Sequence, residues 1–341
     1  MNLSELDFTY PDELVALSPL EERDSSRMMV LDRSTGRIEH RYFSDFPSHF
    51  SQGDLLVLND SKVFPGRLIG YREGGGRIEC LLVNEVEPLL WECLVDGSAR
   101  VRKGETLTFS ENLSGDFMDE GGPTRKIRFS FDGSFWDEVD RIGQVPLPTY
   151  IKRPENFPLD RDRYQTVYAE KVGSSAAPTA GFHFTHDILS QLKGRGVEIV
   201  YVTLHVGPGT FLPIRTGRVE DHVMHGEFYE ISEGSAVAIR QATREGRGIT
   251  AVGTTAVRTL ESAWDPDQVI KAGRGFTKKF IYPPYQFSLV DRLLTNFHQP
   301  RSTLLALVAA FTGMEPVRRA YQEAIAEKYR LFSYGDCLWI L

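Results

Sequence analysis

Polar and apolar residues alternate in a series of short runs between about residues 67 and 145. Residues 126–131 (KIRFSF) alternate strictly, which is typical of a strand with one buried face. Residues 77–83 and 90–95 have a similar pattern, and glycine-rich turns separate the runs. Helical periodicity is almost absent from this stretch. The pattern therefore predicts a small all-β unit.

The second half of the chain combines helical and strand-like patterns. A helix is predicted after Thr185, a good N-cap residue, because Ile188, Leu189 and Leu192 share one face. Residues 197–203 follow as a buried strand. This alternation of helix and strand is typical of an α/β core.

Five further elements are predicted towards the C-terminus. A helix is expected over residues 233–245, and a strand over residues 249–252 leads into another helix. Pro316 is placed at the first position of a C-terminal helix, where its missing N–H costs nothing. Residues 332–341 are expected to form a hairpin-like segment.

The first 64 residues also read as mixed α/β, so the β unit is predicted to be inserted into one larger domain. Residues 146–148 (PLP) mark the return of the chain. The predicted fold class is α/β: a mixed α/β, distorted barrel-like main domain of residues 1–64 plus 150–341, with a small inserted all-β domain of residues 65–149.

Composition describes an ordinary soluble globular chain. Of its 341 residues, 41% are hydrophobic, 25% charged and 11% aromatic, which excludes collagen-like, coiled-coil and disordered classes. The 47 acidic residues outnumber the 39 basic ones and give a net charge of −8. This balance argues against a protein that coats nucleic acid or membrane by bulk charge.

Two features predict a cytoplasmic protein. Cys80, Cys93 and Cys337 are too few and too far apart for a disulfide framework or a metal knuckle. The N-terminus has no basic and apolar signal segment, and the longest apolar stretch, residues 304–311, is shorter than the ~20 residues that span a bilayer.

Five segments are rich in Gly, His and hydroxyl residues. In the first, residues 177–185, Thr179 and Gly181 precede His183, which is a candidate proton carrier or a packed imidazole at a helix entry. The second, residues 205–211, follows a predicted strand and is a candidate ligand loop or a tight structural turn. Its candidate residues are His205, Gly207, Gly209 and Thr210.

The third segment would suit a metal ion by composition. His222, His225 and Glu227 could supply three zinc ligands, which would make the protein a metal-dependent hydrolase. The spacing is not HExxH, however, and the two imidazoles would point to opposite faces of a strand. Metal-free polar recognition and a plain surface cluster are the alternatives.

The last two segments lie at predicted helix starts. Gly253, Thr254 and Thr255 could present backbone N–H groups to an anion, with Arg258 holding a carboxylate, or the threonines could simply cap the helix. Asn296 and His298 precede an apolar helix that Ser302 or Thr303 could cap. Neither Asn296 nor His298 has a capping role.

Read in order, these segments resemble the S-adenosylmethionine:tRNA ribosyltransferase-isomerase family of queuosine biosynthesis. The resemblance also rests on residues 23–27 (RDSSR), 53–63 (GDLLVLNDSKV), 163–169 (RYQTVYA) and 332–336 (FSYGD). It implies transfer of the ribosyl group of S-adenosylmethionine to 7-aminomethyl-7-deazaguanine at the wobble position of tRNA, giving epoxyqueuosine-tRNA, adenine and methionine. It further implies an α/β domain with a smaller β domain, and no metal or bound cofactor.

The chemistry implied by the resemblance suggests roles for the candidate residues. Proton carriers and polar anchors are sought among His183, His205, His222, His225 and His298. Asp60 and Asp336 are candidates to orient these imidazoles or to attract the sulfonium cation, and Arg258 to hold the methionine carboxylate.

The expected partners are S-adenosylmethionine and tRNA, with no membrane, and the protein is expected to be a monomer or a weak homo-oligomer. Since the net charge is negative, tRNA contact requires local basic groups. Two basic runs are candidates: Lys271, Arg274, Lys278 and Lys279, and Arg318, Arg319, Lys328 and Arg330. A non-catalytic RNA-binding module is the third hypothesis, and the sequence disfavours it because it contains no recognised RNA-binding motif.

Overall fold

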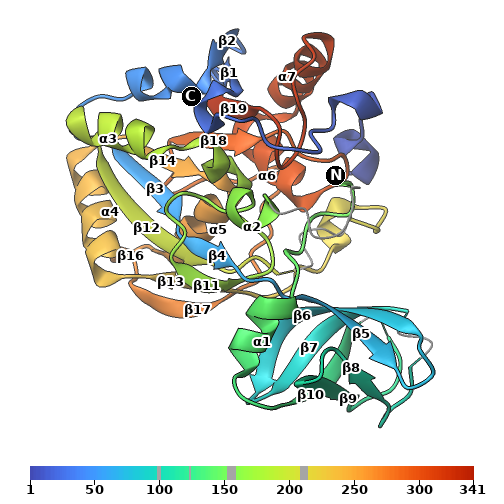
Figure 1. The fold of residues 1–341 in the computed structure, drawn as a ribbon. Coiled ribbons are helices and arrows are strands. Elements are labelled where there is room, and N and C mark those ends of the chain that lie inside the picture. The colour runs from blue at the N-terminus through green and yellow to red at the C-terminus, as the bar shows by residue number, and fades with distance from the viewer. Residues whose placement is uncertain (98–100, 123, 152–158, 208–213) are drawn as a thin grey trace.

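The computed structural model describes residues 1–97, 101–122, 124–151, 159–207 and 214–341. It consists of a large mixed α/β domain and a smaller β-barrel domain that projects from one side of it (Figure 1). The predicted fold class is therefore confirmed. The domain boundaries at residues 65 and 149 stay a prediction. No described helix is long and apolar enough to span a membrane.

A nine-stranded sheet forms the centre of the large domain. Four adjacent strands, β12, β3, β14 and β18, run parallel to one another, so their carboxyl ends meet at one edge. In order across the sheet, the strands are β17 (Gly273–Thr277), β13 (Glu227–Ile231), β12 (Glu198–Leu204), β3 (Leu55–Asn59), β14 (Ile249–Val252), β18 (Arg292–Asn296), β19 (Cys337–Ile340), β1 (Arg27–Leu31) and β2 (Ile38–Tyr42).

Alternate residues of the central strands serve two different cores. Leu55 and Val57 of β3 pack on the side of α4, α5 and α6, whereas Leu56 and Leu58 pack on the side of α3 and η4. Because both faces are covered, β3, β14 and β19 consist entirely of buried residues, as parallel strands in α/β proteins do. The helices are η4 (Phe43–His49), α3 (His186–Gly194), α4 (Glu233–Glu245), α5 (Gly253–Ala263), α6 (Thr303–Thr312) and α7 (Met314–Ala326).

Local sequence explains most helix boundaries. The side chains of Thr185, Ser232 and Ser302 each accept a hydrogen bond from the backbone N–H three residues later, and so cap α3, α4 and α6. The predicted helix 233–245 and strand 249–252 are present with those bounds. At the C-terminal end of α4, Gly246 adopts a left-handed conformation with φ of 65°.

Two predictions near the C-terminus are wrong. Pro316 occupies the third position of α7, not the first, and is tolerated because the N–H groups of the first turn have no helical partner. The last ten residues are not a hairpin, since β19 pairs in parallel with β1 and antiparallel with β18. The chain turns before this strand at Gly335, where a Cβ atom would lie 2.4 Å from the carbonyl oxygen of Arg330.

The small domain is a closed barrel of six strands packed around its own apolar core. Helix α1 (Phe135–Ile142), which the sequence pattern did not predict, covers one end with Phe135 and Val139. Cys80 and Cys93 are free thiols in this core, and burial raises the pKa of Cys80 to about 12. The strands are β5 (Arg67–Arg72), β6 (Arg77–Glu87), β7 (Leu90–Asp96), β8 (Thr106–Thr108), β9 (Leu113–Phe117) and β10 (Thr124–Phe131).

Short elements connect the two domains and shape the edge of the sheet. Strands β4 (Ser61–Val63) and β11 (Lys171–Ser174) form a parallel ribbon between the large sheet and the barrel. The others are η1 (Leu3–Leu6), η2 (Asp12–Leu14), η3 (Arg23–Ser25), α2 (Asp160–Arg163), η6 (Thr179–His183), η8 (Val219–Asp221), β15 (Trp264–Asp265) and β16 (Val269–Ile270).

Candidate functional site

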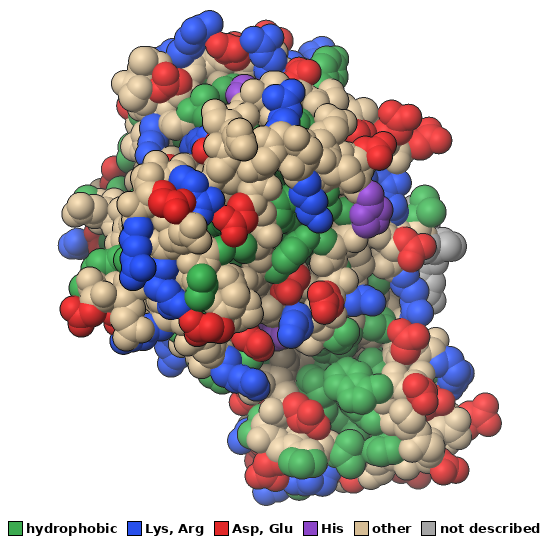
Figure 2. Space-filling view, turned by 90° about the vertical axis from the view of Figure 1, so that its left-hand side faces the viewer, with side chains coloured by type: hydrophobic (Ala, Val, Ile, Leu, Met, Phe, Trp, Pro, Cys, Tyr) green, Lys and Arg blue, Asp and Glu red, His purple; other side chains and the backbone are tan. Residues whose placement is uncertain are grey.

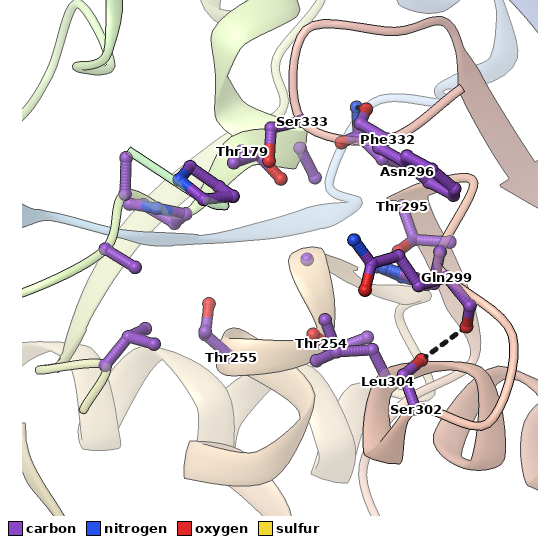
Figure 3. A pocket seen from close by; sticks show the side chains of 18 of the residues that line it. Thr179, Thr254, Thr255, Thr295, Asn296, Gln299, Ser302, Leu304, Phe332 and Ser333 are labelled. Atoms are coloured by element: carbon purple, nitrogen blue, oxygen red, sulfur yellow. Dashed lines mark hydrogen bonds between the residues drawn. The ribbon is translucent and has the colours of Figure 1, made fainter. Parts of the chain in front are cut away.

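A cavity opens where β14 and β18 end, at the carboxyl edge of the parallel strands. The empty space between its walls, open solvent included, amounts to about 830 Å³. Thr179 and Ser333 lie across the cavity from Thr254 and Thr255 (Figure 3). A crevice at this edge is the usual ligand position in open α/β sheets.

The start of α5 forms one wall of the cavity. Gly253 is the first helical residue and has a φ of 83°, while Val252 is the N-cap and makes no side-chain capping bond. Thr254 and Thr255 are therefore second and third in the helix, and the interpretation that they cap it is wrong. The Thr255 hydroxyl lines the cavity and has no hydrogen-bond partner among the described residues.

The end of β18 contributes a histidine to the cavity. His298 is 9% exposed, its Nε2 lies 2.7 Å from the Thr295 hydroxyl, and its backbone N–H donates to the Tyr321 hydroxyl. Burial lowers the pKa of His298 to about 3. The imidazole is therefore neutral near pH 7.

Asn296 connects the cavity to His183 behind its wall. Its Nδ2 donates to the Phe332 carbonyl oxygen at 3.1 Å and lies 3.5 Å from Nε2 of His183. On the other side of the His183 ring, the Ser26 hydroxyl lies 2.7 Å from Nδ1. Burial lowers the pKa of His183 to about 3, and His183 does not line the cavity. This network leaves Asn296 Oδ1 buried, in the cavity wall, without a partner among the described residues.

Two candidate residues of η6, Thr179 and Gly181, have different surroundings. Thr179 lines the cavity. Gly181 does not, and a Cβ atom there would lie 2.1 Å from the Tyr168 hydroxyl oxygen. Glycine is thus required at this position by close packing.

The segment after β12 lies beside the cavity. His205 is outside it, stacked on Phe228 with ring centroids 5.5 Å apart, and burial lowers its pKa. The Gly207 N–H donates to Glu227 Oε1 at 3.1 Å. Gly209 and Thr210 lie outside the described residues.

Glu227 forms a buried ion pair with Arg258, and this pair replaces the predicted zinc cluster. Arg258 also donates from Nε to the Lys279 carbonyl oxygen, and neither member of the pair lines the cavity. His222 packs edge-on to Phe280, and His225 is exposed. Within the described ranges, no three His, Cys, Asp or Glu side chains are grouped to hold a metal ion. The hydrolase alternative is therefore not favoured.

The two candidate aspartates are buried outside the cavity. Asp60, at the end of β3, accepts a hydrogen bond from the Thr203 hydroxyl at 2.6 Å. Asp336 accepts from the backbone N–H groups of Arg27 and Arg330 at 2.9 and 2.8 Å. Burial raises the pKa of both carboxyl groups. The contacts of Asp336 tie the turn before β19 to neighbouring backbone.

Sequence reasoning missed several residues of the cavity wall. Tyr164 is fully buried, and burial raises the pKa of its hydroxyl. The Tyr150 hydroxyl is hydrogen-bonded to Ser333, and burial raises the pKa of Tyr150 to about 12. The available signal was the pair of motifs at residues 163–169 and 332–336, in which only Asp336 had a predicted role. The missed lining residues include Tyr150, Tyr164, Gln299, Phe332 and Ser333.

The predicted basic runs are partly neutralised by ion pairs. Lys271 pairs with Asp265, and Arg318 pairs with Glu315. On the face of the large domain that Figure 2 shows, acidic and basic side chains are interspersed. This face therefore has no continuous basic surface.

Two comparisons with known proteins agree. The family model described as "Queuosine biosynthesis protein" matches residues 3–340. The crystal structure of an S-adenosylmethionine tRNA ribosyltransferase from Thermotoga maritima is similar to this chain at 38% identity, covers 99% of this chain and 100% of its own, and has a TM-score of 0.56. Since the family model spans nearly the whole sequence, the chain belongs to the queuosine biosynthesis protein family.

Proposed function

We propose that the protein transfers and isomerises the ribosyl moiety of S-adenosylmethionine onto 7-aminomethyl-7-deazaguanine at the wobble position of tRNA. The products are epoxyqueuosine-tRNA, adenine and methionine. The observation that carries this proposal is the cavity at the carboxyl edge of the sheet, with two buried polar atoms that lack partners among the described residues: Asn296 Oδ1 and the Thr255 hydroxyl. Buried polar atoms without partners are costly, and a polar ligand would satisfy them.

His298 is the proposed proton carrier. Of the five candidate histidines, it is the one that lines the cavity. As a neutral imidazole it is available to accept a proton from the carbon beside the sulfonium centre, where the ribosyl group must be activated. The positive charge it then gains would be costly in the buried site, so the proton is expected to pass on to the departing adenine.

The remaining groups bind or position the substrate. Free N–H groups at the start of α5, beside Gly253 and Thr254, suit the methionine carboxylate. Asn296 contributes Oδ1, and His183 is a positioning residue that acts through Asn296. Arg258 is proposed to act through Glu227, whose other oxygen holds the Gly207 N–H.

The test is incubation with S-adenosylmethionine and tRNA that carries the aminomethyl precursor. We expect one adenine to be released for each tRNA that is modified. We also expect the wobble nucleoside to have the mass of epoxyqueuosine. Adenine release without any change in the tRNA would contradict the proposed transfer. Binding of tRNA with no adenine at all would instead favour a non-catalytic RNA-binding module.

Metal independence is a second expected result. We propose that the reaction uses no metal or organic cofactor, because the groups assigned above supply binding and proton transfer. Adenine formation is expected to stay within about twofold when a zinc-selective chelator is added, whereas a metal-bound water would be lost with its ion. Loss of activity on chelation, restored by added zinc, would contradict this expectation.

Thr255→Val is expected to raise the KM for S-adenosylmethionine about three- to tenfold, which corresponds to the loss of one neutral hydrogen bond. The valine is nearly isosteric and removes only the hydroxyl that lines the cavity. The matched control is Thr243→Val, at an exposed position of α4. Equal kinetics for both variants would exclude Thr255 from ligand contact.

We further propose a cytoplasmic enzyme that acts as a monomer or weak homo-oligomer. Gel filtration with light scattering at several concentrations measures the oligomeric state directly. A concentration-independent oligomer would contradict this part of the proposal.

A further inference from the structure

Two arginines from distant parts of the sequence, Arg23 and Arg163, line a small pocket beside the cavity, and the charge of a third, Arg330, acts on His183 in the wall of that pocket. Arg23 comes from η3, Arg163 from the end of α2, and Arg330 from the segment before β19. Arg23 and Arg163 line the pocket together with Ser26, His183 and Ser333. The pocket has about 300 Å³ of empty space. Ser333 also lines the cavity, so the two sites are adjacent.

The three guanidinium groups are anchored by backbone carbonyl groups, not by acids. Arg23 donates to the carbonyl oxygens of Phe182 and Asp162 at 3.2 Å, and Arg163 to those of Glu21 and Leu20. Arg330 donates to the carbonyl oxygen of Ser18.

No ion pair joins any of these three arginines to a carboxylate of a described residue. The charge of Asp336 acts on Arg330, although the Asp336 carboxylate is bonded to backbone N–H groups. Arg23 and Arg163 therefore bring to the pocket positive charge that no described carboxylate neutralises by an ion pair.

Two guanidinium donors still lack an acceptor. Nε of Arg163 and Nη1 of Arg330 are buried and have no hydrogen-bond partner among the described residues. Burial, and then the neighbouring charge of Arg163, lowers the pKa of Arg23, as expected where like charges are held together. Buried N–H donors around a cationic pocket are the arrangement that binds an oxyanion.

We propose that the pocket lined by Arg23 and Arg163, with Arg330 near it, binds a backbone phosphate of the tRNA next to the modified nucleotide. This inference rests on the proposed function, since it assigns the tRNA substrate a contact beside the cavity. The free N–H donors of Arg163 and Arg330 can each bond to a non-bridging oxygen of a phosphodiester, and such contacts fix the register of a nucleic acid on its enzyme. Ser333 lines both sites, so the phosphate would lie next to the cavity where the base must react. The pocket also explains how a chain of net charge −8 can hold RNA.

The test measures tRNA affinity against salt for Arg23→Gln, Arg163→Gln and the double variant. The apparent Kd of the double variant is expected to rise about tenfold near 0.1 M salt, and the slope of log K against log salt to fall by about 1 for the lost phosphate. The KM for S-adenosylmethionine is expected to stay within about twofold. The matched control is Arg244→Gln, at an exposed position of α4, which should leave the slope unchanged.

If Arg163→Gln does not fold, Arg163→Lys still tests the proposal. Lysine retains the positive charge but lacks the planar guanidinium group. The tRNA affinity of this variant is expected to be intermediate. An unchanged salt slope in every variant would overturn the proposal. A raised KM for S-adenosylmethionine with unchanged tRNA affinity would also overturn it, because the pocket would then hold the methionine carboxylate.

Failure of this inference can be told apart from failure of the proposed function. If the wild-type protein forms epoxyqueuosine but the variants keep the wild-type salt slope, only the phosphate pocket is wrong. If the slope falls in the variants but the wild-type protein releases no adenine, the proposed reaction is wrong and the phosphate contact stands.

Discussion

His298→Gln is expected to lower the rate of adenine release by about 10²–10⁴-fold, the usual contribution of a proton-transfer group. His298 lies in the cavity wall, and burial, which lowers its pKa to about 3, keeps the ring unprotonated near pH 7. Glutamine can retain the hydrogen bond to the Thr295 hydroxyl but cannot take up a proton. Single-turnover adenine release at saturating S-adenosylmethionine and tRNA measures the effect directly.

The matched control for this prediction is His186→Gln. His186 is exposed on the first turn of α3, away from the cavity. Its activity is expected to stay within about twofold of wild type, as for most surface substitutions. A loss of less than tenfold in His298→Gln, with the KM for S-adenosylmethionine unchanged, would rule out His298 as the proton carrier. His222→Gln and His225→Gln are expected to cost less than His298→Gln because neither ring lines the cavity.

Two buried histidines are expected to contribute about 4 kcal/mol of destabilisation on acidification from pH 8 to pH 5, about 2 kcal/mol each. Burial lowers the pKa of His183 and of His298 from 6.5 to about 3. The unfolded chain therefore binds these protons more tightly than the folded protein does. Their contribution to stability is complete above pH 6.5 and is lost as the pH falls from 6.5 towards 3.

Urea unfolding at several pH values checks this expectation, with His183→Gln and His298→Gln as comparison variants. Each substitution should remove about half of this contribution between pH 8 and pH 5. The buried carboxyl groups of Asp60, Asp336 and Glu261 act in the opposite direction, because burial raises their pKa. Their effect is the same in wild type and variants, so the difference isolates the histidines. Equal pH dependence in all three proteins would contradict the burial argument.

Much of the fold could be predicted because its signals are local. The cap residue Thr185 and the apolar face of α3 lie within one turn of each other in the sequence, and the same is true of Ser302 and α6. The barrel strands were visible because residues 126–131 alternate with a period of two. Helix α1 was missed because it is only eight residues long and mixes acidic with aromatic residues.

The C-terminal segment could not be predicted from local pattern. Residues 337–340 are a buried strand whose partners, β1 and β18, lie about 300 and 45 residues away, and no local signal specifies either pairing. A turn at Gly335 close to a run of apolar residues suggested a hairpin instead. The long-range parallel pairing with β1 overrides that local signal.

The sequence by itself determined which chemical groups the protein has, the order of its elements and the family to which it belongs. Only the tertiary structure decided which of those groups share a cavity: His298, Asn296 and Thr255 line it, while His183 lies behind Asn296 and Glu227 is paired with Arg258. The physical reason is that burial and partner choice depend on contacts between residues far apart in the chain. Histidines with the same side chain therefore differ in role. One lies in the wall of the cavity, another positions a residue from behind it, and others are exposed to solvent, according to what the fold packs against each ring.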